Sequence, residues 1–307
     1  PGTRPIRHSF PTVKQKDVRT IAKILRQETS NPNKVDNTRY LASAQQLYQW
    51  FIGPVEKQLK RQKIDTLLFC VGASLRSLPL ATLHDGKKFL VEKYNIGLIP
   101  AFSLIDLRYT KLQDTKVLAM GASEFQDLTP LPAVPQELTA ITKSQGGSAF
   151  LNNQFTVENL QAQRQQQPYG IVHLATHARF QSGIVENSYL QFWDQKISLN
   201  QLSKLQLRLP IVDLLVLSAC QTALGDPQAE LGFAGLAIQS GAKSVLGTLW
   251  SVSDEGTLQL MRQFYKYLKV SPIKAEALRK AQVETLQKKE FSHPYYWSAF
   301  TMIGSPW

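Results

Sequence analysis

A cysteine and a histidine each follow a strongly apolar segment of this sequence. Cys220 comes after a run that begins at Ile211 and is interrupted only by Asp213, and His177 comes after the segment 171–175. Runs of this length and composition are typical of strands buried on both faces of a parallel sheet. Because ligands bind at the carboxyl edge of such sheets, we expect both side chains to lie at that edge.

A thiol and an imidazole at one sheet edge favour nucleophilic catalysis. The thiolate attacks a carbonyl carbon, and a neutral histidine beside it takes the thiol proton. Cys220 and His177 are far apart in the chain, so only the fold can bring them together. The backbone N–H groups of Cys220 and Ala178 are the natural donors to an oxyanion. The residues alone leave a second interpretation open, in which Cys220 is a buried structural thiol and His177 only makes ordinary hydrogen bonds.

Composition narrows the class of protein. The chain has 307 residues, 43% of them hydrophobic, which is enough for one large domain or two ordinary ones. No apolar run reaches the roughly 18 residues of a membrane helix, so we expect no membrane partner. Two cysteines do not make a disulfide framework and favour a reducing, cytoplasmic setting. We expect Cys70, which lies inside its apolar run, to be a core residue.

The net charge of +12 admits nucleic acid as a partner. Basic residues are spread along the chain, however, and no nucleic-acid module is recognisable, so we expect a solvated basic surface instead. His173 and His177 are four residues apart, but a strand places such positions about 13 Å from each other. We therefore expect no metal site and no cofactor.

The order of predicted elements indicates an α/β fold with a mainly parallel sheet. From Lys116 onward, strands and helices alternate, as in βαβ units. We expect an arm or linker over 1–38, a smaller α/β subdomain over 39–115 and the main domain over 116–307. Predicted helices are 39–51, 55–62, 136–143, 157–166, 233–240 and 255–270; predicted strands are 64–71, 89–91, 95–99, 117–120, 148–151, 171–175, 211–217, 242–250 and 295–303, with a hairpin formed by 189–193 and 196–199.

Four segments resemble the CHAT domain, a caspase-like family often found behind tetratricopeptide repeats in bacteria. They read VHLATHARF at 172–180, VLSACQTALG at 216–225, GAKSVLGTLWSVSD at 241–254 and HPYYWSAFTMIG at 293–304. The resemblance implies a three-layer caspase-like sandwich and a cysteine peptidase of the separase and caspase type, with Cys220 and His177 as its dyad. Many members have glycine where this chain has Ala178, a change that keeps the backbone N–H.

The resemblance also suggests a substrate preference. The segment LWSVSD at 249–254 is similar to one that lines the pocket for a basic residue in separases, which would place Asp254 opposite arginine or lysine. The other interpretation is that Asp254 only caps the helix that follows. The residues Trp250, Ser251, Val252 and Ser253 are expected to pair with the substrate backbone, and Ser218 is also assigned to substrate binding.

Two functions from different classes remain. In the first, the chain is a cysteine endopeptidase that cuts a specific protein or peptide substrate, controlled by a preceding regulatory region or a partner protein. In the second, it is a caspase-like scaffold or protein-binding module without activity. The start of the sequence lacks methionine, which suggests a fragment of a longer or processed polypeptide.

Overall fold

The structure is a computed structural model that describes residues 7–106, 108–179, 188–218, 235, 237–238 and 240–307. Its main feature is a central sheet with the strand order β1-β2-β11-β10-β9-β5-β3-β4. These strands are β1 (Thr66–Phe69), β2 (Asn95–Leu98), β3 (Val117–Gly121), β4 (Gly147–Leu151), β5 (Ile171–Ala175), β9 (Leu214–Ser218), β10 (Ser244–Thr248) and β11 (Phe300–Gly304). Only the β10–β11 pairing is antiparallel, so the predicted, mainly parallel sheet is confirmed.

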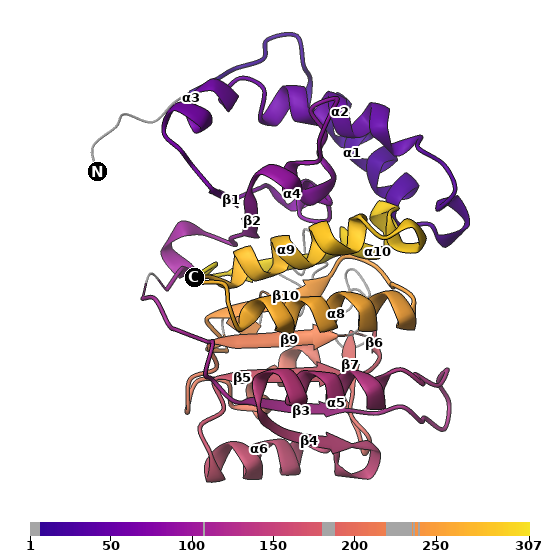
Figure 1. Ribbon diagram of the computed structural model, residues 1–307, viewed down its shortest axis with the longest axis vertical. Helices are drawn as coiled ribbons and strands as arrows, with labels where there is room; N and C mark the ends of the chain where they lie inside the picture. The colour runs from indigo at the N-terminus through magenta and orange to yellow at the C-terminus, as the bar shows by residue number, and fades with distance from the viewer. Residues whose placement is uncertain (1–6, 107, 180–187, 219–234, 236, 239) are drawn as a thin grey trace.

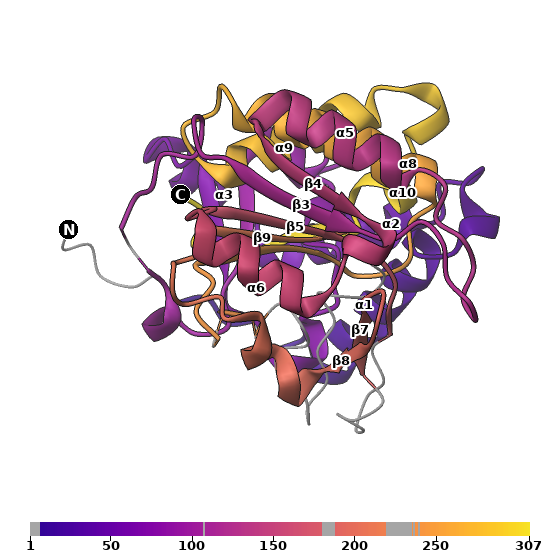
Figure 2. The same ribbon diagram turned by 90° about the horizontal axis from the view of Figure 1, so that it is seen from below.

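Helices cover both faces of this sheet. Figure 2 shows α5 (Val134–Gln145), α8 (Asp254–Leu268) and α9 (Lys274–Leu286) on one face, with α6 (Val157–Gln166) on the other. A small antiparallel sheet of β6 (Ala178–Arg179), β7 (Tyr189–Gln191) and β8 (Lys196–Ser198) lies on the side of α6. The predicted three-layer architecture is therefore confirmed.

The other elements are short or belong to the amino-terminal part. The helices are α1 (Gln15–Thr29), α2 (Tyr40–Phe51), α3 (Glu56–Arg61), α4 (Leu90–Lys93) and α10 (Pro294–Trp297), and the 3-10 turns are η1 (Pro32–Lys34), η2 (Ala73–Leu75), η3 (Leu80–Thr82), η4 (Phe102–Leu104), η5 (Asn152–Gln154), η7 (Leu199–Leu205) and η8 (Lys289–Phe291). In Figure 1, α1–α4 gather at the end of the molecule beyond β1 and β2. The central sheet thus contains strands from both sides of the boundary drawn at 115/116, and the domain boundaries themselves stay predictions.

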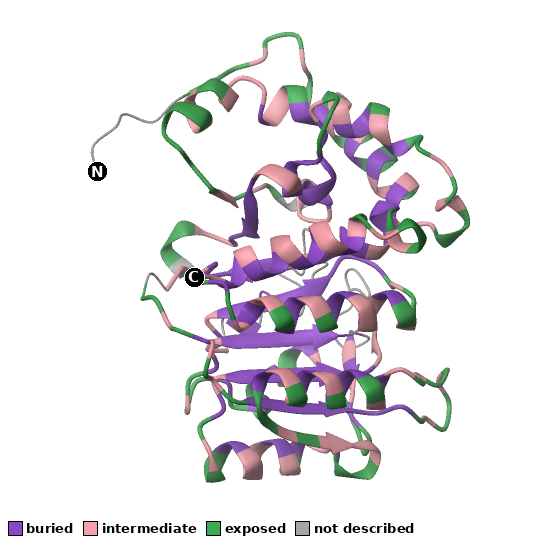
Figure 3. Cartoon of the chain, viewed as in Figure 1, coloured by how far each residue is buried: buried purple, intermediate pink, exposed green. Residues whose placement is uncertain are grey.

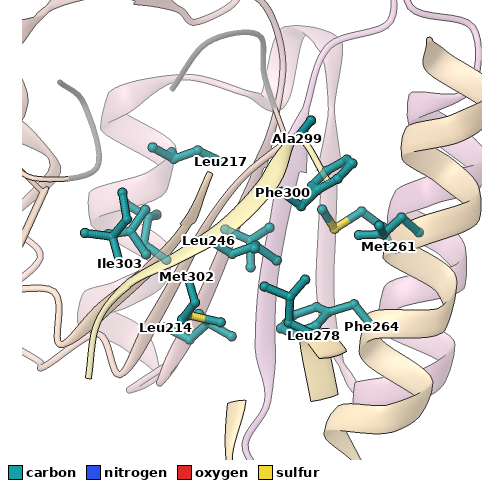
Figure 4. Close-up of a cluster of buried hydrophobic side chains, with 14 of the residues drawn as sticks. Leu214, Leu217, Leu246, Met261, Phe264, Leu278, Ala299, Phe300, Met302 and Ile303 are labelled. Atoms are coloured by element: carbon teal, nitrogen blue, oxygen red, sulfur yellow. The ribbon is translucent and has the colours of Figure 1, made fainter. Parts of the chain in front are cut away.

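The core lies between the sheet and its helices. Every residue of β3, β5, β9 and β10 is buried, in agreement with their apolar sequences (Figure 3). Side chains of α8 and α9, among them Met261 and Leu278, meet side chains of β10 and β11 such as Leu246 and Phe300 in this core (Figure 4). Packing on both faces therefore holds the strands whose ends form the site.

Three expectations were wrong for local reasons. Residues 89–91 begin helix α4, because the Glu92 carboxylate accepts a hydrogen bond from the Phe89 N–H and caps that turn. Residues 295–297 are helical as well, since His293 caps α10 and Pro294 suits a first helical turn. Cys70 is exposed, because it follows an edge strand that is only half-buried. Half of the predicted helix 233–240 lies outside the described residues.

Candidate active site

The strands that precede His177 and Cys220 in the sequence are neighbours in the sheet. β5 and β9 run parallel, and their last residues, Ala175 and Ser218, are direct partners. Beyond this pair, the Thr176 N–H donates to the Ser218 carbonyl oxygen at 3.2 Å. The ends of the two strands therefore coincide at the carboxyl edge of the sheet. Cys220 itself lies outside the described residues, so the distance between its sulfur and the imidazole stays untested.

The ring of His177 is held by the loop that follows β3. Its Nε2 lies 2.7 Å from the carbonyl oxygen of Thr129, and the Phe125 ring is tilted against it with 4.7 Å between the centroids. A carbonyl oxygen can only accept a hydrogen bond, so Nε2 must carry the hydrogen. In the neutral ring this leaves Nδ1 as the basic nitrogen.

A small cavity of about 50 Å³ lies beside His177 at this edge. Four of the predicted site residues line it, namely His177, Ser218, Val252 and Asp254. Its remaining walls come from Leu131, Val134, Glu137, Thr176, Thr248 and Thr257. The fold thus brings segments that are distant in sequence to one pocket.

Asp254 is one of the two carboxylates that line this pocket, the other being Glu137. It is the first residue of α8, and its Oδ2 accepts a hydrogen bond of 2.7 Å from the Ala133 N–H. Burial raises the pKa of the Asp254 carboxyl, and the charges of Glu137 and Glu255 add to this rise, whereas the Ala133 hydrogen bond and the charge of His177 oppose it. Ser253, not Asp254, makes the capping hydrogen bond of α8, to the Gly256 N–H.

The other predicted site residues differ in their exposure to solvent and in the elements they belong to. Trp250 is buried, and its indole N–H donates to the Tyr295 carbonyl oxygen at 3.0 Å. Ser251 and Ser253 are exposed. Ala178 lies in β6, where it is paired with Leu190 of β7. The pairing of 250–253 with a substrate and the oxyanion role of Ala178 stay predictions.

Two residues of the site were missed in the sequence. Thr129 contributes a backbone carbonyl, which no side-chain pattern reveals. Glu137 lies in the predicted helix 136–143 and was assigned no role there, yet only 2% of it is exposed. Its carboxylate accepts a hydrogen bond of 2.7 Å from the Ser218 hydroxyl.

A wider hollow of about 620 Å³ opens on the other side of Phe125. It is bounded by the loop after β3 and by the hairpin of β7 and β8. This hairpin is also hydrogen-bonded to the site, since the Gln191 N–H donates to the His177 carbonyl oxygen at 2.9 Å. The lining residues are Glu124, Phe125, Gln126, Asp127, Leu128, Gln191, Trp193, Asp194 and Lys196.

The solved structures that match this fold include a separase–securin complex and a cysteine proteinase. The separase–securin complex of Saccharomyces cerevisiae matches with a TM-score of 0.54 and 15% identity, over 82% of this chain and 16% of that one. The Arg-specific cysteine proteinase gingipain R matches with a TM-score of 0.55 and 10% identity, over 95% of this chain and 75% of that one. At these identities the likeness shows the fold alone, and it confirms the caspase-like architecture.

Sequence comparisons give the family. Mouse (Mus musculus) tetratricopeptide repeat protein 28 is 39% identical over 105 residues, which is 33% of this chain and 4% of that protein, so the chain spans a small part of this relative. No helix among the described residues is long and apolar enough to cross a membrane. The family model of the CHAT domain matches residues 41–305, and the chain therefore belongs to the CHAT domain family.

Proposed function

We propose that this chain is a cysteine endopeptidase with Cys220 as nucleophile and His177 as general base. The observation that carries the proposal is the coincidence of the ends of β5 and β9 beside a pocket lined by His177 and Asp254. His177 follows the last residue of β5 by two positions, and Cys220 follows the last residue of β9 by two positions. The family and the fold both support peptidase chemistry at this edge.

The proposed reaction follows from the state of His177. Nδ1 takes the proton of the Cys220 thiol, and the sulfur bonds to the carbonyl carbon of the scissile peptide. The backbone N–H groups of Cys220 and Ala178 donate to the oxyanion. The carbon–nitrogen bond then breaks as Nδ1 returns its proton to the departing amine. Water hydrolyses the thioester, releases the carboxylic acid and restores the thiol.

The Thr129 carbonyl gives His177 the properties that this reaction needs. As the hydrogen-bond acceptor of Nε2–H, it fixes the ring plane and the tautomer. It also stabilises the imidazolium that forms when Nδ1 takes the thiol proton, because its dipole points its negative end at the charged ring. A histidine held in this way is prepared for its role before substrate arrives.

The substrate is proposed to carry a basic residue before the scissile bond. Asp254 offers a carboxylate that is partly buried and within the electrostatic reach of His177. Burial makes the ionised carboxylate costly unless a cation pairs with it, and a guanidinium or ammonium group supplies that charge. Gingipain R, which has the same fold, is described as Arg-specific.

Control by another segment or partner belongs to the same proposal. The mouse relative is named for tetratricopeptide repeats, and the yeast separase structure is a complex with securin. Both are much longer than the part that this chain matches. A regulatory region in the same polypeptide, or a protein bound to it, is therefore proposed to control access to the site.

Labelling of the thiol tests this function. A peptidyl acyloxymethyl ketone with arginine next to the warhead is added to the parent chain and to the Cys220→Ala and His177→Ala variants, all with Cys70→Ser because Cys70 is exposed. The proposal expects rapid labelling of the parent alone. Labelling of the parent no faster than of the His177→Ala variant would favour the scaffold function instead. Cleavage of a peptide library with arginine or lysine before the scissile bond then measures turnover.

A further inference from the structure

Four polar side chains are buried beneath the pocket, and the proposed reaction uses none of them directly. They come from four different elements: Glu137 of α5, His173 of β5, Ser218 of β9 and Tyr265 of α8. His173 and Tyr265 are fully buried, and 2% of Glu137 and 7% of Ser218 are exposed. Burial of polar groups costs free energy unless hydrogen bonds compensate their desolvation. The contacts within this cluster therefore indicate what it does.

The Glu137 carboxylate is the centre of this cluster. Its Oε1 accepts a hydrogen bond of 2.7 Å from the Ser218 hydroxyl and lies 3.1 Å from Nε2 of His173. The contact with His173 is close but poorly aligned for a hydrogen bond. Nδ1 of His173 lies 3.2 Å from the Tyr265 hydroxyl, which extends the cluster to α8. Glu137 is in the first turn of α5, where the helix dipole stabilises an anion.

Ser218 is therefore held from two sides. Its carbonyl oxygen accepts from the Thr176 N–H, and its hydroxyl donates to Glu137. Thr176 immediately precedes His177, and Ser218 precedes Cys220 by two positions. Two residues of chain span at most about 7 Å, so a fixed Ser218 limits where the segment that carries the thiol can begin.

We propose that Glu137 is a positioning residue, which holds the end of β9 through Ser218 and so sets the thiol of Cys220 against the imidazole of His177. This inference rests on the proposed peptidase function. It assigns a role to a carboxylate that lines the same pocket as Asp254 but whose hydrogen bond goes to the strand end. A hydrogen bond to a charged group is stronger than a neutral one, which suits a fixed anchor.

The test is the pH profile of alkylation at Cys220 by iodoacetamide, a small reagent that needs no substrate pocket. The reaction is followed by mass spectrometry on the peptide that contains Cys220, so Cys70 does not contribute. A thiol paired with a histidine reacts at lower pH than a free thiol, whose pKa is about 8.5. The His177→Ala variant gives the profile without the base.

Two variants remove the anchor, and one keeps it. Ser218→Ala and Glu137→Ala are expected to raise the midpoint of the alkylation profile by about one pH unit, toward that of His177→Ala. At pH 7 the alkylation of Cys220 should then be roughly tenfold slower. Glu137→Gln retains an acceptor oxygen and is expected to stay near the parent. Ser244→Ala is the matched control, since this buried serine of β10 bonds to the Asp213 carbonyl oxygen at the opposite end of the sheet.

The possible outcomes distinguish a failure of the Glu137 proposal from a failure of the proposed peptidase function. If Ser218→Ala and Glu137→Ala fold, as judged by their melting curves, and keep the parent profile, Glu137 does not position the thiol. If the parent already reacts like a free thiol and His177→Ala changes nothing, the peptidase function fails and this proposal with it. A shift produced equally by Ser244→Ala would mean a general loss of stability and would also overturn the anchor role.

Discussion

Nε2 of His177 donates a hydrogen bond to the carbonyl oxygen of Thr129 at 2.7 Å. This single contact decides which ring nitrogen can act as base, because a carbonyl oxygen accepts only from an N–H group. It also shows how the loop after β3, which carries no reactive side chain in the proposed reaction, contributes to the site.

The tautomer of His177 is the first prediction. Two-bond ¹H–¹⁵N spectra of the neutral ring are expected to show a pyrrole-like Nε2 and a pyridine-like Nδ1. The signals are assigned by their loss in the His177→Gln variant. The reverse pattern would mean that the Thr129 contact does not form in solution, and the proposed role of Nδ1 would have to be abandoned.

Replacement of Asp254 by asparagine is the second prediction. The variant keeps an acceptor oxygen for the Ala133 N–H, so the helix ends should stay in place. Loss of the charge is expected to lower kcat/KM for peptides cleaved after arginine roughly 10- to 100-fold, the value of a charge-assisted contact, and to spare matched peptides with citrulline. Asp114→Asn, at an exposed position paired with Lys111, is the control.

The stability of the Asp254→Asn variant gives an independent check. Burial raises the pKa of Asp254, so the folded state favours the protonated acid. Its contribution to stability is therefore present at low pH and is lost as the pH rises through the raised pKa. The melting temperature of the variant, relative to that of the parent, is therefore expected to increase as the pH rises through the pKa of Asp254. A variant that loses stability instead would show that the charge has a structural role.

Much of the scaffold was predictable because apolar pattern and burial coincide there. The segment 171–175 is strand β5 with the predicted ends, and 157–166 is helix α6 with Thr156 as its cap, as its side chain accepts from the Asn159 N–H. These are elements whose local signals agree with the fold. The sequence predicted that His177 and Cys220 follow strands ending at the same edge, and the structure shows that these strands, β5 and β9, are direct neighbours.

The parts that could not be predicted depend on tertiary contacts. The burial of Glu137 follows from the way α5 packs over β3 and against α8, and nothing in its own helix indicates it. Cys70 looked like a core residue because its neighbours are apolar, but the strand before it is at the edge of the sheet. The Thr129 carbonyl has no sequence signal, since every residue carries one.

His293 gives a pH-dependent stability outside the site. Burial lowers its pKa to about 4, and its Nδ1 accepts a hydrogen bond from the Tyr295 N–H at the start of α10. Between pH 6.5 and 4 the unfolded chain binds a proton that the folded chain does not, so stability falls as the pH falls through this window, by at most about 1.4 kcal/mol per pH unit.

Urea unfolding at several pH values between 7 and 4 measures this effect. The His293→Asn variant keeps a capping acceptor without a titrating ring, and its stability is expected to depend less on pH over this range. His8→Asn, at an exposed position, should leave the slope of the parent unchanged. Equal slopes for the parent and His293→Asn would show that His293 is not buried in its neutral form.

Lys274 is a buried cation, and its removal should stabilise the fold. Only 1% of this residue is exposed, its Nζ has no hydrogen-bond partner among the described residues, and burial lowers its pKa to about 8. At pH 7 the folded state therefore bears the cost of a desolvated ammonium group. Lys274→Met is expected to raise the free energy of unfolding by roughly 1–3 kcal/mol at pH 7.

The pH dependence of this variant separates the charge from the packing. The unfolded chain holds its lysine proton up to about pH 10.5, so the parent should gain stability as the pH rises from about 8 toward that value. Lys274→Met should show less of this gain, and Lys57→Met, at an exposed position of α3, should behave as the parent does. Destabilisation by Lys274→Met at pH 7 would mean that the ammonium group has a partner that compensates its burial, because methionine fills nearly the same volume.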